Sequence, residues 1–207
     1  MKIAIIQPTP HRKGHYFVYT KSLFDELINL GERVKIISAD KVYCDLNNEK
    51  SSRLNFNIYS FKGLIIYLFL CLLTIIRFII NRNYFNRLII LDCEYSCVSI
   101  LLLALKLLNW NGKITLQVNA PNFKYDFKTD GLNIFRILKF IQSYIFKYSL
   151  NLLDLKISCL GKWHKQELSK QLNFNTKKII IIEDGGGGII KKIPDKELSE
   201  KLFKALI

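Results

Sequence analysis

Acidic residues are scarce in this sequence. Its 207 residues hold 17 Asp and Glu against 31 Lys and Arg, which gives a formal net charge of +14 at pH 7. Such an excess favours an anionic partner: a phosphorylated ligand, an anionic lipid or nucleic acid. A lysine-rich proteome would produce the same excess, and the abundance of Ile and Asn fits that explanation as well. The charge alone therefore narrows the class of partner without choosing among these.

The sequence also lacks a disulfide framework and a metal-binding cluster. Its five cysteines are odd in number and scattered along the chain: Cys44, Cys71, Cys93, Cys97 and Cys159. Three residues separate Cys93 from Cys97 where a zinc knuckle has two, and no histidine is near. We therefore expect reduced thiols in a cytosolic protein, and no metal site. The opening apolar run ends at Gln7 and is too short for a signal peptide. Its length therefore also predicts a cytosolic protein.

Nucleotide- and RNA-binding signatures are missing too. The fingerprint G-x-G-x-x-G of dinucleotide-binding proteins does not occur, and there are no internal repeats. Basic and aromatic residues do not alternate as they do in a recognised RNA-binding module. Nucleic acid is therefore the less favoured partner, although a non-enzymatic nucleotide- or nucleic-acid-binding protein stays an alternative supported by the charge.

The sequence does contain a strand–helix–strand unit at its start. Residues 2–7 form a short, β-branched apolar run that predicts a strand covered on both faces, and Pro8 ends it. Apolar residues then recur at helical spacing across 16–30, and Gly31 suits a helix C-cap. Residues 33–38 predict a second strand. The order indicates a βαβ unit with a right-handed crossover, whose first strand ends at a ligand crevice.

Strand-like and helix-like segments continue to alternate along the chain. Further strands are predicted at 56–59, 87–92, 113–118, 155–159 and 178–182, and helices at 64–80, 100–108, 132–150, 162–172 and 194–207. This alternation predicts an α/β protein with a Rossmann-like three-layer domain and a mainly parallel sheet. We expect that domain to occupy residues 1–188, with a linker and a short C-terminal helix at 189–207.

Two of the predicted helices are unusually apolar. Only Arg77 interrupts the segment 64–80, whose seventeen residues are a marginal length for crossing a bilayer. Three interpretations stay open for it: a buried helix of the domain, a helix lying on a membrane, or a span. On 132–150 a basic stripe of three side chains suits either an anionic membrane surface or the solvent-exposed face of a core helix: Arg136, Lys139 and Lys147.

The ordered series of strands resembles the N-terminal half of a GT-B glycosyltransferase of the family-4 retaining type. Residues 2–38 resemble the opening strand, glycine loop, helix and strand of that family. Residues 88–92 resemble the strand that ends at the cleft between its domains, and 113–121 the next strand with its cleft loop. Residues 154–168 and 178–185 resemble the strand–Ser–helix segment and the closing strand before the second domain. The series of five carries the resemblance, since no single motif is specific.

The resemblance implies the acceptor-side domain of a transferase that moves a sugar from a nucleotide-sugar to a lipid-linked or cell-surface glycan. It implies no cofactor beyond that donor substrate. Together with the basic charge and the two apolar helices, it leads us to expect a peripheral position at the inner face of the membrane. The chain stops where the family's second, donor-binding domain begins, so we expect a partner chain or a longer product to complete the enzyme.

The first candidate site residues follow the strands predicted at 2–7 and 87–92. In the loop after residue 7, Gly14 and His15 could contact a phosphate together with the following helix N-terminus. The family's loop has two or three glycines where this chain has Gly14 alone. Asp92 and Glu94 stand where the family often has histidine, and are the candidate catalytic base or acceptor-binding residues.

Two further substrate-binding candidates follow later strands. Asn119 stands in the loop after 113–118, again where the family often has histidine, and Lys162 begins the helix after Gly161. Each has a plain alternative, because Asn before Ala-Pro suits a turn and most such lysines are solvated. The same holds for His15, which suits a solvent-exposed loop equally well.

Overall fold

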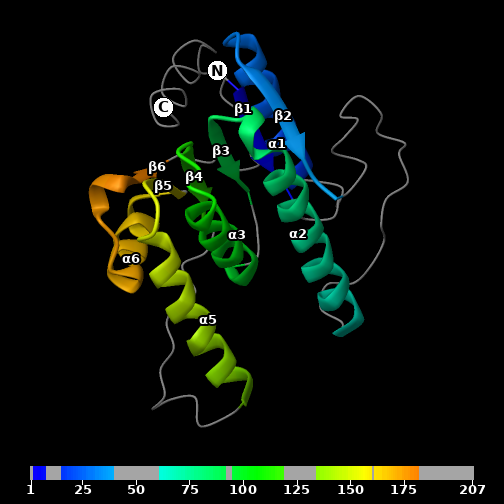
Figure 1. The fold of residues 1–207 in the computed structure, drawn as a ribbon. Coiled ribbons are helices and arrows are strands. Elements are labelled where there is room, and N and C mark those ends of the chain that lie inside the picture. Colours follow the sequence, from blue (N-terminus) through cyan, green and yellow to red (C-terminus); the bar gives the residue numbers. More distant parts are fainter. Residues whose placement is uncertain are drawn as a thin grey trace. The chain divides into compact units, whose positions relative to one another are not determined.

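The computed structural model describes residues 2–7, 15–39, 61–91, 95–118, 134–159 and 161–181. Within them, six strands form one parallel sheet in the order β2-β1-β3-β4-β5-β6 (Figure 1). The strands are β1 (Lys2–Ile6), β2 (Arg33–Ile37), β3 (Arg87–Ile90), β4 (Lys113–Gln117), β5 (Leu155–Cys159) and β6 (Ile179–Ile181). The helices that flank the sheet are α1 (His15–Asn29), α2 (Phe61–Asn81), α3 (Tyr95–Leu107), α5 (Ile134–Leu150) and α6 (Lys162–Leu172).

This arrangement confirms the predicted α/β fold with a parallel, Rossmann-like sheet. Several predicted boundaries differ from the observed ones. The largest shift is in α3, which begins at Tyr95, well before residue 100, and Lys178 belongs to the 3-10 turn η3 (Thr176–Lys178) rather than to β6. The predicted strand at 56–59, the tail helix at 194–207 and the boundary between 188 and 189 lie outside the described residues.

The chain divides into two compact units, Met1–Ile114 (unit 1) and Thr115–Ile207 (unit 2), and the division falls inside β4. In unit 1, β1 lies between β2 and β3, with Ile3 paired to Val34 on one side and to Arg87 on the other. The chain passes from β1 to β2 and then back across β1 to β3. Because such crossovers are right-handed, α1 covers one face of these strands, and α2 and α3, which pack together, cover the other. Cover on both faces explains why β1 is continuously apolar.

An aromatic cluster fastens the end of α2 inside unit 1. Phe78 is fully buried, with its ring centroid 6.0 Å from that of Phe85 and 5.7 Å from that of Trp110. The Trp110 indole N–H donates to the carbonyl of Arg82, in the 3-10 turn η2 (Arg82–Tyr84), at 3.2 Å. The ring lies so close to Gly112 that a Cβ there would come within 2.1 Å of it. A glycine is therefore required at this position for the tryptophan to enter the core.

Helix α2 has two apolar faces with different surroundings. Its inner face is buried in unit 1 and consists of Leu70, Cys71, Thr74, Ile75 and Phe78. Its outer face is exposed although it is equally apolar, and consists of Ile65, Phe69, Leu72, Ile76 and Ile80. The segment Lys62–Tyr84 is also long and apolar enough to cross a membrane. However, 33% of its most apolar stretch of 18 residues is buried inside the protein.

Unit 2 is built around β5 and β6, in which Ile157 pairs with Ile179. The Val118 N–H donates to the carbonyl of Ser158 at 2.9 Å, one residue beyond the end of β4. Among the residues of α5 whose burial is described, 140–150, the buried ones are Phe146, Ser149 and Leu150. Another face of α5 is exposed and apolar, and its residues are Phe140, Ile141, Tyr144, Ile145 and Tyr148.

Candidate functional site

The candidate site in unit 1 is defined by a reversal of strand order. β2 lies on one side of β1 and β3 on the other, so the carboxyl ends of β1 and β3 form a topological switch point. Ile6 pairs with Ile90, and the Leu91 N–H donates to the Ile6 carbonyl at 2.9 Å. Gln7 and Leu91 are therefore level with each other at the carboxyl edge of the sheet. In parallel α/β sheets, ligands bind at such an edge.

The predicted site residues of unit 1 belong to the two segments that leave this edge. Gly14, Asp92 and Glu94 lie outside the described residues. His15 is the first residue of α1, and its side chain is outside the described part of the chain. The described strand ends thus bring the starts of the two segments together, and the roles of these four residues stay predictions.

A buried polar pair at the same edge was missed by the sequence analysis. Gln7 is 1% exposed and Thr20 is 0% exposed, and the Gln7 amide Nε2 donates to Thr20 Oγ1 at 3.2 Å. The Gln7 backbone N–H donates to the carbonyl of Ile37 at 3.2 Å, which continues the pairing of β1 with β2. The pair joins α1 to the end of β1, and so positions the residues on either side of the Gly14 loop. The sequence did contain a signal for this pair, because Gln7 is a polar residue directly after a buried strand.

Helix α2 holds the adjacent strand end. Thr74 Oγ1 accepts a hydrogen bond from the Ala39 N–H at 2.9 Å and donates to the carbonyl of Leu70 at 2.8 Å. The Arg77 guanidinium donates to the carbonyl of Ser38. Arg77, which interrupts an otherwise apolar segment in the sequence, therefore fixes the end of β2 to α2.

The remaining two candidates belong to unit 2. Asn119 lies outside the described residues and directly follows Val118 at the end of β4. Lys162 is the first residue of α6, directly after the extended residue Gly161, and its side chain is exposed. Both residues thus follow the paired ends of β4 and β5. An exposed lysine at a helix start is also what the solvated alternative for Lys162 requires, so its binding role stays a prediction.

The most deeply buried cation of the described residues lies away from the carboxyl edge. Arg87 is 2% exposed and is the first residue of β3, at the opposite edge of the sheet. Burial lowers the pKa of its guanidinium, and the nearby carboxylate of Glu32 raises it. Arg87 is therefore part of the core and not available to bind an anionic ligand. Among the described residues, no three His, Cys, Asp or Glu side chains are grouped so that they could hold a metal ion.

Cys159, at the end of β5, is a thiol kept neutral by its surroundings. Burial raises the pKa of Cys159, while a backbone hydrogen bond with Gly161 and the charge of Lys165 lower it less. A raised pKa favours the protonated thiol, which is a weak nucleophile. The raised pKa therefore gives no support to a nucleophilic role for Cys159.

This shift predicts a pH dependence of stability. The unfolded thiol loses its proton at a lower pH than the folded thiol does. The stabilisation that Cys159 contributes is therefore complete below the unfolded pKa and is lost as pH rises through the folded pKa. We expect the difference in unfolding free energy between wild type and Cys159→Ala to shrink as pH rises from 8 through the alkaline range, measured by urea denaturation. A difference that stays constant with pH would show that the thiol titrates normally.

No family model matches this sequence, and no curated protein matches it. The features that bear on function are therefore the strand order, the residues at the carboxyl edge of the sheet and the exposed surfaces of the helices.

Proposed function

We propose that this chain is the acceptor-side half of a GT-B-type glycosyltransferase, which transfers a sugar from a nucleotide-sugar to a lipid-linked or cell-surface glycan. The observation that carries the proposal is the switch point between β1 and β3. Its two strands lead into the segment that ends at Gly14 and His15 and into the acidic segment Asp92–Glu94. The order of strands along the chain, given above, supports the same assignment.

In this proposal each segment has a chemical role. Asp92 or Glu94 acts as the base that takes the proton from an acceptor hydroxyl. The acceptor oxygen bonds to the anomeric carbon of the donor, while the bond from that carbon to the nucleotide phosphate breaks and the nucleotide leaves. Backbone N–H groups around Gly14 and at the start of α1 bind phosphate, and Asn119 and Lys162 contact the substrate. The donor-binding domain is supplied either by a longer product of the same gene or by a separate partner chain.

Sugar transfer by the native protein tests the proposal. The tagged chain is isolated from its own cells under non-denaturing conditions and incubated with radiolabelled nucleotide-sugars and a lipid extract of those cells. We expect label in the lipid fraction, and a decrease of about 100-fold or more when the base is removed by Asp92→Asn or Glu94→Gln. Asp25→Asn, at an exposed position of α1, is the matched control and should leave transfer unchanged.

Two further results bear on this proposal. An immunoblot against residues 113–150 gives a band near 24.2 kDa if the half is made by itself, and a band of about twice that mass if both domains share one chain. Absence of sugar transfer, together with tight and salt-sensitive binding of random DNA or RNA, would overturn the proposal in favour of a non-enzymatic nucleic-acid-binding protein.

A further inference from the structure

The outer face of α2 is a continuous apolar surface that faces solvent. Its five residues follow one another at intervals of three or four, so they form one line along about 22 Å of helix. Phe69 is 57% exposed and Ile80 is 73% exposed. A soluble monomer seldom leaves an apolar line of this length uncovered. The face therefore requires an occupant.

The inner face of α2 limits how a membrane could meet this helix. Phe78 is enclosed by Phe85 and Trp110, and Thr74 and Arg77 are hydrogen-bonded to the end of β2. Crossing a bilayer would expose these side chains to lipid and remove α2 from the sheet that it covers. The contacts instead allow α2 to lie along a surface with only its outer face immersed.

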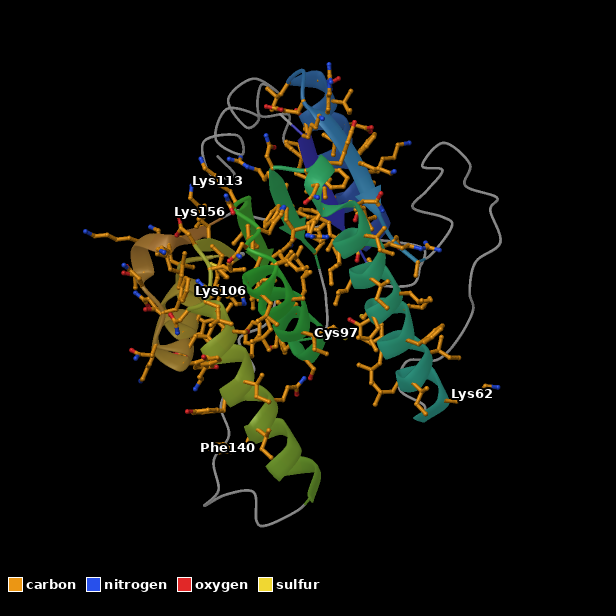
Figure 2. All side chains as sticks on the ribbon, viewed as in Figure 1. Lys62, Cys97, Lys106, Lys113, Phe140 and Lys156 are labelled. Carbon is orange, nitrogen blue, oxygen red and sulfur yellow. The ribbon has the colours of Figure 1, made fainter. Side chains whose placement is uncertain are left out.

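The charges around the outer face suit an anionic surface. No Asp or Glu occurs from Lys50 to Leu91, a stretch that includes all of α2. Lys62 is exposed at the first turn of the helix, where Figure 2 shows its side chain extending away from the domain. Arg77 lies in the last turns of α2, and Arg82 follows the helix directly, with its guanidinium donating to the carbonyl of Ile79. Both ends of the apolar line thus carry positive charge.

Helix α5 of unit 2 shows the same combination independently. Among its described side chains, exposed apolar residues recur at helical spacing from Phe140, labelled in Figure 2, to Tyr148. Between Gly131 and Leu153 the sequence has three basic residues and no acidic one. An apolar face in a stretch without acidic residues therefore occurs once in each unit.

We propose that the outer face of α2 lies in the interface of an anionic lipid bilayer, with the helix axis parallel to the membrane plane. Anionic headgroups attract lysine and arginine, at about 1 kcal/mol for each residue near the surface, and the apolar line enters the acyl boundary. A second copy of the chain fits less well, because each copy has a net charge of +14 and repels the other. This inference does not rest on the transferase proposal and holds or fails separately from it.

Vesicle flotation of the full chain tests the proposal. Wild type is mixed with vesicles of phosphatidylcholine alone or with about one third phosphatidylglycerol, and lipid-bound protein is recovered from the top of a density gradient. We expect flotation with the anionic vesicles, and a fall of roughly tenfold or more in binding for the double variant Phe69→Gln with Ile80→Gln. The matched control is Ile28→Gln with Leu30→Gln, which removes two exposed apolar side chains at the end of α1 and should keep binding near the wild-type level.

Three outcomes would overturn the proposal. The first is no flotation, or flotation that the α2 variant and the α1 control reduce equally. The second is protein that stays in the vesicles after alkaline extraction, because a peripheral helix is released and a span is not. The third is a dimer in sedimentation experiments that the α2 variant dissociates, without vesicle binding, which would make the face an interface between copies. Circular dichroism of each variant establishes that it is folded.

Discussion

Phe78→Ala is expected to lower the free energy of unfolding by about 4 kcal/mol. Phe78 is 0% exposed, and its ring contacts those of Phe85 and Trp110. Truncation removes the buried ring and leaves a cavity, and it also removes two favourable aromatic contacts. Because these ring contacts attach the end of α2 to unit 1, we also expect α2 to be less firmly held in the variant.

The same helix offers a matched control, because Phe69 is 57% exposed on the outer face. Phe69→Ala makes the same chemical change in the same helix and should alter the unfolding free energy by less than about 0.5 kcal/mol. The measurement is urea denaturation followed by tryptophan fluorescence in a Trp163→Phe background, which leaves Trp110 as the only tryptophan. Equal losses for the two variants would contradict the assignment of an inner and an outer face.

This pair of phenylalanines also shows what sequence could not resolve in α2. Periodicity identifies a buried face by the contrast between apolar and polar positions. Here Phe69 and Phe78 lie on opposite faces of the helix and both faces are apolar, so periodicity could not tell which face is buried. The sequence accordingly left three interpretations of the segment open. The distinction depends on tertiary contacts with Phe85 and Trp110, which no local pattern contains.

The strands were predicted closely because a strand in a parallel sheet with both faces covered reads as a short apolar run. The β5 prediction, 155–159, matches the observed strand, and the β1 prediction, 2–7, exceeds it by one residue. Strand ends were overestimated when the next residue was also apolar or buried, as at Gln7. Boundaries of this kind depend on hydrogen-bond partners in other strands rather than on residue type.

The candidate site was predictable in position but not in its supporting contacts. Residues that follow strands of a parallel sheet meet at one edge, and this rule selected the segments after β1 and β3. The hydrogen bonds Gln7–Thr20 and Arg77–Ser38 join residues whose partners are set by how helices pack on the sheet. Arg77 could be recognised in the sequence as an exception in an apolar helix, but its acceptor could not.

The Arg87→Met substitution is the second large effect that we expect, with a loss of about 3 kcal/mol in unfolding free energy. Arg87 is 2% exposed, and the carboxylate of Glu32 lies near enough to raise its pKa. One carboxylate oxygen of Glu32 is itself buried, so removing the guanidinium leaves a partly buried negative charge without its nearby cation. We place the loss at the low end of the range for broken buried pairs, because Glu32 is partly exposed.

A double-mutant cycle separates this electrostatic effect from lost packing. Glu32→Gln removes the charge that Arg87→Met leaves behind, so the double variant should be more stable than the sum of the two losses predicts, by about 1 kcal/mol or more. Arg33→Met, which removes an exposed arginine at the start of β2, is the control and should change stability by less than about 0.5 kcal/mol. Strict additivity in the cycle would mean that Arg87 contributes only through the packing of its side chain.

The position of Arg87 makes a second readout of this variant informative. It begins β3, at the amino-terminal edge of the sheet, whereas Asp92 and Glu94 follow the carboxyl end of the same strand. Arg87→Met should therefore reduce stability, and leave sugar transfer per folded molecule unchanged in the assay described for Asp92→Asn. If the variant stayed folded but lost sugar transfer, Arg87 would have a functional role at the amino-terminal edge of the sheet, which would contradict its assignment as a core residue.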